Sequence, residues 1–136
     1  VREPSLMVRQ LFIDDCGMKD EQFALILQGI KAQGRQLNVL SYGNNELGPL
    51  SLQLLKELIP DLRELTLVNN KSKSDSKASY EALLFNIIDF NFQIQKLKLS
   101  NINLNDQNLV DLICEIVKSK ELLSTLDLSW AKLGTQ

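Results

Sequence analysis

The residue types that could support catalysis are scarce in this chain. The sequence of 136 residues contains no histidine and two cysteines, Cys16 and Cys114. Without histidine the chain cannot build a Ser-His-Asp or Cys-His nucleophilic system, or a histidine metal site. The two cysteines lie far apart in the sequence, outside any Cys-x-x-Cys pair, and are too few for a four-cysteine zinc site. We therefore expect no enzyme activity, no catalytic residues, no cofactor and no metal.

Charge and hydropathy narrow the class of partner. The chain has 15 basic and 17 acidic residues, a formal net charge of -2, and lacks the concentrated basic surface that nucleic-acid binding needs. No apolar run approaches the roughly 18 residues of a membrane span. We interpret Cys16 and Cys114 as reduced packing residues, which favours an intracellular, cytoplasmic compartment. A protein partner is expected, with no nucleic acid, membrane or small-molecule substrate.

A repeated segment must position whatever side chains bind that partner. Five segments follow the template L-x-x-L-x-L-x-x-N/C-x-L, at residues 8–18, 37–47, 62–72, 94–104 and 123–133. Their second apolar positions recur at intervals of roughly 30 residues and are occupied by Leu11, Leu40, Leu65, Leu97 and Leu126. A single L-x-L pattern carries no information, but five copies in register indicate an internal repeat.

The gaps between these segments have helical periodicity. The predicted helices cover residues 20–33, 49–60, 77–89 and 106–118. Asp20 is the expected N-cap of the first helix, and Gly34 lies where a left-handed residue would end it. Pro49 suits a first helical position, and Asn105 or Asp106 should cap the last helix.

Alternating strands and helices of this length predict an α/β fold with parallel strands. A strand–helix–parallel-strand unit is right-handed in nearly all proteins. Helices are about 10 Å wide, whereas paired strands are about 4.8 Å apart, so the stack must curve. The expected architecture is a right-handed solenoid, with a curved parallel sheet on the concave side and helices on the convex side.

These motifs resemble the leucine-rich repeat family, in its ribonuclease-inhibitor-like subtype, over residues 8–134. Members of that family are mostly protein-binding scaffolds, so the resemblance implies protein–protein interaction. It also implies a single domain of about five repeats over residues 1–136. The last repeat stops before any helix, whereas a natural terminal repeat protects the core with a polar outer face. We therefore expect this domain to be a fragment of a longer array.

The resemblance assigns a structural role to the N/C position of the template. In the family this side chain lies inside the turn and binds the backbone of neighbouring turns. Cys16, Asn45 and Asn70 match the pattern, whereas Ile102 and Ala131 do not. The ladder of side chains should therefore break in the C-terminal half.

The concave face is the main candidate site, because side chains that flank the buried strand positions face outward. We expect it to bind a partner through aromatic and charged side chains, which are common interface anchors: Phe12, Asp14, Asp15, Glu64, Lys96, Lys98, Asp127 and Trp130. In this interpretation Lys96 and Lys98 form a basic pair, and Asp14, Asp15 and Glu64 make the other end acidic. Alternatively, Phe12 and Trp130 pack against further repeats at the two ends. The concave face has a projected area of roughly 300 Å². A standard interface buries about 800 Å² on each partner, so this face alone is barely large enough.

Other features have weaker support. The polar stretch 71–77 lengthens the third repeat and is expected to be a solvated loop, either an insertion without a role or a site of modification or contact. Asn70 begins a glycosylation pattern, but its place inside a turn excludes a glycan. Two alternative functions remain. One is a structural spacer in a large assembly; the other is regulation of a GTPase, although the arginines fall outside the strand-to-helix loops, at Arg2, Arg9, Arg35 and Arg63.

Overall fold

Strands and helices alternate along the chain, as expected. The computed structural model describes residues 9–32, 34, 36–68, 70–72, 77–100 and 105–129. Within this part a five-stranded parallel sheet has the order β1 (Gln10–Asp14), β2 (Val39–Gly43), β4 (Glu64–Val68), β6 (Lys96–Leu99) and β7 (Thr125–Asp127). A second sheet pairs β3 (Glu46–Leu47) with β5 (Lys71–Ser72). The helices of this part are α1 (Asp20–Ala32), α2 (Pro49–Leu58), the 3-10 turn η2 (Ile59–Asp61), α3 (Lys77–Phe90) and α4 (Gln107–Ser119).

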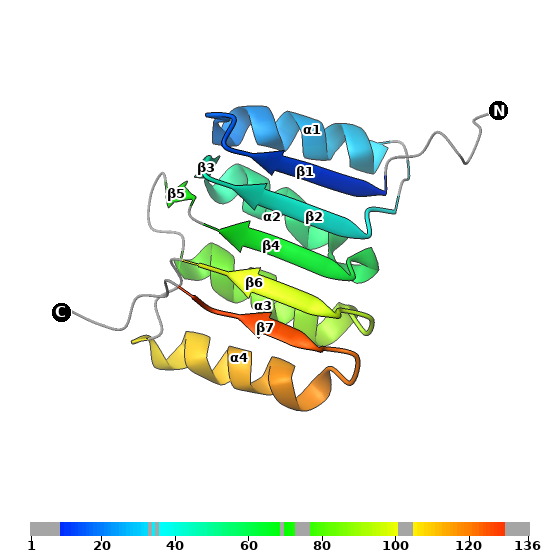
Figure 1. The fold of residues 1–136 in the computed structure, drawn as a ribbon, viewed down its shortest axis with the longest axis vertical. Coiled ribbons are helices and arrows are strands. Elements are labelled where there is room, and N and C mark those ends of the chain that lie inside the picture. The colour runs from blue at the N-terminus through cyan, green and yellow to red at the C-terminus, as the bar shows by residue number, and fades with distance from the viewer. Residues whose placement is uncertain are drawn as a thin grey trace.

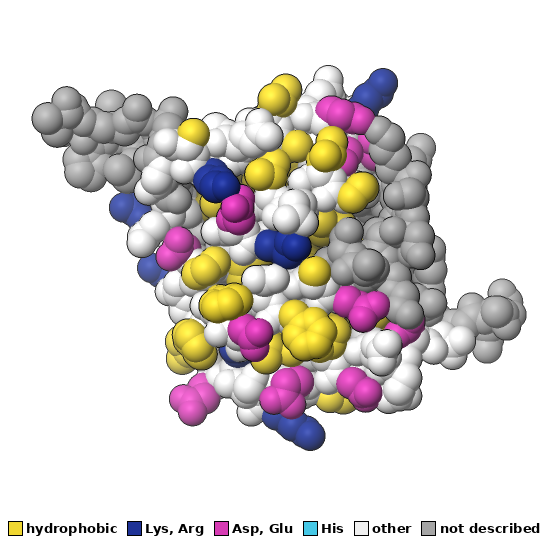
Figure 2. Space-filling model, turned by 180° about the vertical axis from the view of Figure 1, so that it is seen from behind, with side chains coloured by type: hydrophobic (Ala, Val, Ile, Leu, Met, Phe, Trp, Pro, Cys, Tyr) yellow, Lys and Arg dark blue, Asp and Glu magenta, His cyan; other side chains and the backbone are white. Residues whose placement is uncertain are grey.

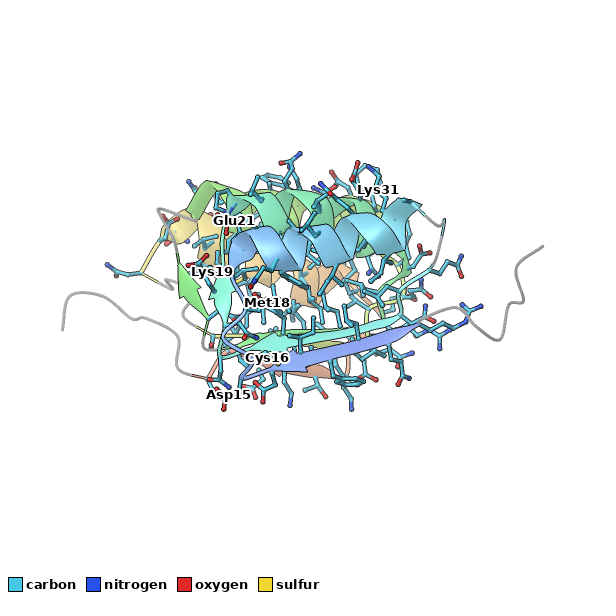
Figure 3. The ribbon with its side chains drawn as sticks, turned by 90° about the horizontal axis from the view of Figure 1, so that it is seen from above. Asp15, Cys16, Met18, Lys19, Glu21 and Lys31 are labelled. Atoms are coloured by element: carbon cyan, nitrogen blue, oxygen red, sulfur yellow. The ribbon has the colours of Figure 1, made fainter. Side chains whose placement is uncertain are left out.

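The strands and helices form two layers. Figure 1 shows the strands of the large sheet side by side in chain order, with the helices behind them. Seen from above, the helices lie over one face of the sheet (Figure 3). No described element covers its other face, which we call the open face. A mixed α/β structure with a parallel sheet and helices on one side is compatible with the leucine-rich repeat expected from the sequence.

The predicted register is confirmed. Leu11 pairs with Leu40, Leu40 with Leu65, Leu65 with Leu97, and Leu97 with Leu126. The three inner leucines are at most 1% exposed, whereas Leu11 and Leu126 on the outer strands are half-buried. The five template positions are therefore equivalent along the sheet, and burial differs where no described strand lies on one side.

The same backbone hydrogen-bond pattern recurs at the start of each strand pair. The carbonyl of Arg9 accepts from the N–H of Asn38 at 2.7 Å and of Val39 at 3.1 Å. The carbonyls of Asn38, Arg63 and Gln95 each accept in the same way from two consecutive N–H groups of the next unit, at 2.7–2.8 Å and 3.1 Å. Successive units are therefore stacked with nearly constant geometry, as parallel pairing requires.

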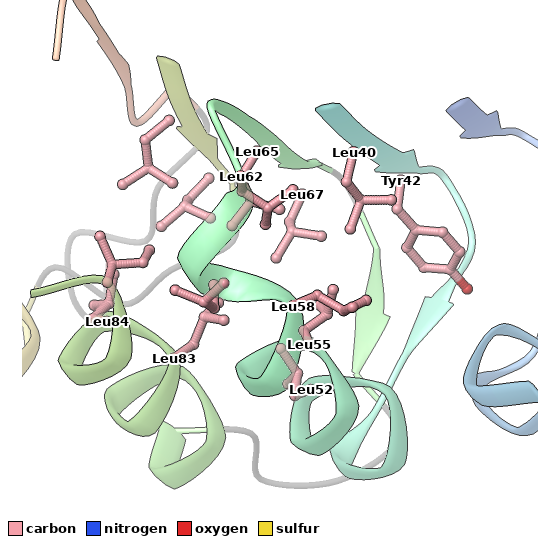
Figure 4. Close-up of a cluster of buried hydrophobic side chains, with 14 of the residues drawn as sticks. Leu40, Tyr42, Leu52, Leu55, Leu58, Leu62, Leu65, Leu67, Leu83 and Leu84 are labelled. Carbon is pink, nitrogen blue, oxygen red and sulfur yellow. The ribbon is translucent and has the colours of Figure 1, made fainter. Parts of the chain in front are cut away.

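The core lies between the two layers (Figure 4). Strand leucines such as Leu40, Leu65 and Leu67 meet helix leucines such as Leu55 and Leu83, and all five are at most 1% exposed. Fully burying such a side chain contributes about 1.5–3 kcal/mol. The units are therefore held together by a single continuous core.

Tyr42 occupies a template position that is usually aliphatic. Its ring is fully buried and stacks on Phe23 of α1, with centroids 3.7 Å apart and planes 6° from parallel. Its hydroxyl donates to the carbonyl of Glu46 at 2.5 Å. Burial, followed by the nearby charges of Asp20 and Glu46, raises the pKa of Tyr42 well above its usual value.

The helix ends confirm most predicted signals and overturn one. Pro49 is the first residue of α2, Asp106 accepts from two backbone N–H groups of α4, and Gly34 has the left-handed φ of +63°. The expectation that Asp20 caps its own helix is wrong. The carbonyl of Lys19 accepts from the N–H of Phe23 at 3.0 Å, so Lys19 occupies the capping position of α1.

The Asp20 carboxylate instead caps the neighbouring helix α2. Asp20 is 1% exposed, and its oxygens accept from the N–H groups of Gly48 at 2.9 Å, Leu50 at 3.1 Å and Ser51 at 3.1 Å. Gly48, at the cap position of α2, has no side chain that could do this. Its missing Cβ also makes room, since a Cβ there would lie 2.7 Å from Asp20 Oδ2.

The asparagines at the N/C position tie adjacent turns together. Asn45 is 5% exposed; its Oδ1 accepts from the N–H groups of Cys16 and Met18 at 3.0 Å, and its Nδ2 donates to the carbonyl of Ile13 at 3.2 Å. Asn70 repeats the pattern by accepting from the N–H of Asn45 at 3.1 Å. The family-based expectation is thus confirmed for Asn45 and Asn70. The Asn70 Nδ2, to which a glycan would attach, donates to the carbonyl of Tyr42 at 3.0 Å.

The two cysteines and the C-terminal half of the ladder differ in how far the structure tests them. Cys16 and Cys114 are free, but both are exposed, so their interpretation as packing residues is wrong. The Cys16 thiol donates to the carbonyl of Asp14 in its own turn, because no described turn precedes it. The predicted break of the ladder at Ile102 and Ala131 lies outside the described residues.

Candidate functional site

One row of side chains crosses the open face of the sheet. Parallel pairing aligns Phe12, Ser41, Thr66, Lys98 and Asp127 on neighbouring strands, between the buried template positions. We call this set the Phe12 row. Because strand residues alternate between faces, the row points away from the helices. Three of the predicted site residues, Phe12, Lys98 and Asp127, are therefore brought onto one line of the surface.

The charged residues of this face are arranged in mixed pairs. Glu64 of β4 is the register partner of Lys96 of β6, and Lys98 of β6 is the partner of Asp127 of β7. Neighbouring strands are about 4.8 Å apart, so each lysine lies beside an acidic residue. The expected separation into a basic pair and an acidic end is wrong for Glu64, because spatial order follows the sheet. The face offers both signs of charge close together.

A hollow of about 670 Å³ opens on this face, over the ends of β4, β6 and β7. Its lining combines hydroxyl, amide, ammonium and carboxylate groups with an apolar floor: Asn44, Thr66, Val68, Lys98, Leu99, Ser100, Asp127 and Ser129. Such a mixture of a few polar groups and apolar surface can accept a protruding side chain of a partner. Thr66, Lys98 and Asp127 belong to both the hollow and the Phe12 row.

Asp127 is held ionised at the edge of the hollow. Its Oδ1 accepts from the backbone N–H of Ser129 at 2.9 Å and from the Ser129 hydroxyl at 2.5 Å. The hydrogen bonds from Ser129, with a further contribution from the charge of Lys98, hold the pKa of the Asp127 carboxyl below its usual value. Both of these hydrogen bonds involve Oδ1, and neither involves the other carboxylate oxygen, Oδ2.

Phe12 protrudes at the other end of the row. Its side chain is 65% exposed, although phenylalanine is a residue type usually buried. It lies on the open face of β1, in line with Ser41 of β2. An exposed aromatic ring on a rigid strand is a typical anchor for a protein partner.

Asp14 is the last residue of β1, and Asp15 begins the turn that follows, where Figure 3 shows it at the sheet layer. Asp15 and Asn44, at equivalent turn positions, have left-handed φ values of 57° and 55°. Aspartate and asparagine adopt this conformation more readily than most residues, so the left-handed turn itself favours an aspartate at this position. Asp14 Oδ1 accepts from Asn44 Nδ2 at 2.8 Å, which fixes the rim of the face beside Gly43.

Two predicted features fall wholly or partly outside the described residues. Trp130 is not described, so its predicted place at the end of the face stays a prediction. The stretch 71–77 is described only at its ends, since Lys71 and Ser72 pair with Glu46 and Leu47 and α3 begins at Lys77. The expectation that this whole stretch is a loop is therefore wrong at its two ends.

The helix side carries side chains that sequence reasoning missed. Phe85, Phe90 and Phe92 are 53%, 57% and 75% exposed, and all belong to α3 or the segment after it. Helical periodicity predicted the buried side of α3, but it did not identify the apolar residues on the outer side of this helix. A helix that is apolar on both sides was the available signal.

Two further polar side chains, also missed, link one unit to the next. Asn91 Nδ2 donates to the carbonyls of Ile59 at 2.6 Å and Leu62 at 2.7 Å. Lys120 Nζ donates to the carbonyl of Ile88 at 2.6 Å and lies 4.8 Å from the centre of the Phe92 ring. Burial lowers the pKa of Lys120, and the charge of Asp89 opposes that shift.

The described part of the chain contains neither a metal-binding cluster nor a membrane-spanning helix. Within it, no three histidine, cysteine, aspartate or glutamate residues gather in a way that could hold a metal ion. None of its helices combines the length and apolar character needed to cross a bilayer. Among the described residues, several of the predicted site residues lie together on the open face.

Comparison with known proteins agrees with the repeat pattern. A ribonuclease inhibitor from Mus musculus is 31% identical to this chain over 130 residues. The match covers 93% of this chain but 28% of that relative, so the chain spans less than a third of the protein that it resembles. No family model matches the chain.

Proposed function

We propose that this chain is a leucine-rich-repeat module of the ribonuclease-inhibitor-like subtype that binds a partner protein without catalysis. In this proposal residues 1–136 are one domain of about five repeats within a longer, right-handed curved array. The recurring strand-start hydrogen bonds, the Asn45–Asn70 ladder and the resemblance to ribonuclease inhibitor support it. Protein interaction in a cytoplasmic setting is the function most compatible with these features and with two exposed, reduced cysteines.

The Phe12 row is the main observation that supports the proposal. It holds a 65% exposed aromatic ring at one end and the register partners Lys98 and Asp127 beside a hollow at the other. Phe12 can insert into an apolar pocket of the partner, while the hollow accepts a side chain from it. The distance between these two anchors, three strand spacings or about 14 Å, fits one small contact area.

Affinity capture with the chain as bait tests this proposal. The bait is compared with Phe12→Ser and Lys98→Glu variants and with Leu25→Ser, a matched control that removes an exposed apolar side chain from the outer side of α1. We expect a protein that is captured by the parent and the control but is depleted with both sheet-face variants. Undiminished capture by both variants would remove the open face as the binding surface.

A second function, a structural spacer, is favoured by the exposed phenylalanines of α3. In that role the helix side and the ends of the stack make the contacts. Capture that survives Phe12→Ser and Lys98→Glu but is lost with Phe85→Ser would support the spacer role.

A further inference from the structure

The outer side of α3 presents an aromatic ring among acidic side chains. Phe85 is 53% exposed, and Asp89, one helical turn later, is exposed on the same side. Figure 2, which looks at the helix side, shows hydrophobic side chains interspersed with acidic ones toward the end of the stack that carries α3 and α4. Monomeric proteins rarely leave large aromatic residues grouped at the surface without a role.

The neighbouring helix adds negative charge to this surface. α4 packs beside α3 and exposes Asp111 and Glu115, which are one helical turn apart. Gln107 Nε2 donates to Asp111 Oδ1 at 2.7 Å, which orients that carboxylate. We call Phe85, Asp89, Asp111 and Glu115 the α3–α4 acidic face.

Two lysines near the C-terminal end of α4 offset part of this negative charge. Lys120 is 6% exposed; its ammonium group donates to the carbonyl of Ile88 and also interacts with the charge of Asp89. Lys118 is exposed one turn after Glu115 and offsets one of the three carboxylates. Three carboxylates against these two lysines leave the face with a net negative charge.

We propose that the α3–α4 acidic face binds a basic segment of a partner protein, with an arginine or lysine side chain stacked on the Phe85 ring. A cation over a phenyl ring is attracted by the ring quadrupole, and adjacent carboxylates can pair with the same cation or its neighbours. A cation–π contact of this kind occurs within the molecule, where Lys120 Nζ lies 4.8 Å from the centre of the Phe92 ring. The proposal concerns the side opposite the open face and goes beyond the function proposed above.

The charge of the face selects this occupant over two others. Nucleic acid is excluded by repulsion between phosphates and the carboxylates of Asp89, Asp111 and Glu115. A second copy of the chain, docked by a two-fold axis, would place the same acidic residues against each other. A basic segment is the partner whose charge is complementary.

Two fluorescein-labelled peptides test the proposal with the intact chain. One is a short amphipathic peptide with arginines along one side; the other has citrulline, a neutral analogue of similar shape, at the same positions. We expect the arginine peptide to bind roughly tenfold more tightly in fluorescence anisotropy, with an affinity that falls as salt is added. Its binding should weaken roughly tenfold with the double variant Asp111→Lys/Glu115→Lys and roughly threefold with Phe85→Ser.

The location of binding is read from amide chemical shifts. Shifts induced by the arginine peptide should cluster on α3 and α4, and Phe12→Ser, on the opposite side, should leave the affinity unchanged. Equal affinity for both peptides, no measurable binding, indifference to the double variant, or shifts confined to the sheet strands would each overturn the proposal. None of these outcomes bears on the open face, so the two proposals can fail separately.

Discussion

The carboxylate of Asp20, at the start of α1, accepts a hydrogen bond of 3.1 Å from the backbone N–H of Ser51 in the first turn of α2. The Ser51 hydroxyl returns a bond of 3.0 Å to the carbonyl of Asp20. One unit thus supplies the helix cap of the next, and the negative charge lies at the positive end of the α2 dipole. The stability of α2 consequently depends on α1.

Replacing Asp20 by alanine should destabilise the whole domain. The N–H groups of Gly48, Leu50 and Ser51 would lose their acceptor, and loss of an N-cap costs about 1–2 kcal/mol. We expect a decrease of about 2 kcal/mol in the free energy of unfolding, measured by urea denaturation. Asp111→Ala, which removes an exposed carboxylate from α4, serves as the control and should change stability little. A loss of similar size in both variants would contradict the capping role.

A methyl group at Gly48 should be harmful because of Asp20. The added Cβ would lie 2.7 Å from Asp20 Oδ2, closer than real Cβ contacts allow. Gly48→Ala should therefore lower stability in the parent chain but much less in the Asp20→Ala background. A double-mutant cycle by urea denaturation measures this coupling, and strictly additive effects would show that the two residues act independently.

Asn45→Ala should be the most harmful change among the turn residues. It removes bonds to the N–H groups of Cys16 and Met18 and to the carbonyls of Ile13 and Gly43, at a site that is 5% exposed. Leaving several buried backbone groups without partners costs about 3 kcal/mol. Thermal unfolding should show a large fall in Tm.

The matched control for Asn45→Ala is Asn86→Ala. The Asn86 side chain makes one bond to the carbonyl of Ala82 within α3. The control should lose less than about 1 kcal/mol, and equal losses would remove the ladder from the account of stability.

Sequence patterns predicted the repeat and its register because both depend on local periodicity. Leu11 and Leu97 are recognisable by their neighbours in the template, and helix limits such as Pro49 and Asp106 are signalled by residue type. The use of Asp20 by another helix was not predictable, since the sequence around it shows a capping residue but not which N–H groups it faces.

The candidate site was predictable as a list of residues but not as an arrangement. Alternation along each strand placed Phe12 and Lys98 outward, as the structure has them. Pairing of Glu64 with Lys96, and of Lys98 with Asp127, depends on which strands are adjacent. The exposed side of α3 was missed because the helical periodicity was used only to predict the buried residues, and Phe85 lies outside that set.

Alkaline pH should destabilise the domain through Tyr80. Burial raises the pKa of Tyr80 from 10.0 to about 12. Below pH 10 the Tyr80 hydroxyl is protonated in both the folded and the unfolded chain, so its contribution to the free energy of unfolding is fully present. Between pH 10 and 12 the hydroxyl ionises in the unfolded chain first, and this contribution is lost. A shift of about 2 pKa units corresponds to a loss of about 3 kcal/mol.

Urea denaturation at pH 9 and pH 11 checks the effect of Tyr80. The Tyr80→Phe variant should lose less stability than the parent over this interval, because phenylalanine does not titrate. Other groups, including Lys120, contribute equally to both chains and cancel in the comparison. The same pH dependence in both chains would rule out Tyr80 as a cause.

Hydrogen exchange of the chain in complex with its captured protein tests the binding proposal most directly. We predict slower exchange at the turns after β2, β4 and β6 and along β7, around Asn44, Val68, Ser100 and Ser129, with the outer helix surfaces unchanged. Protection confined to α1–α4, with these turns exchanging as in the unbound chain, would contradict recognition through the open face.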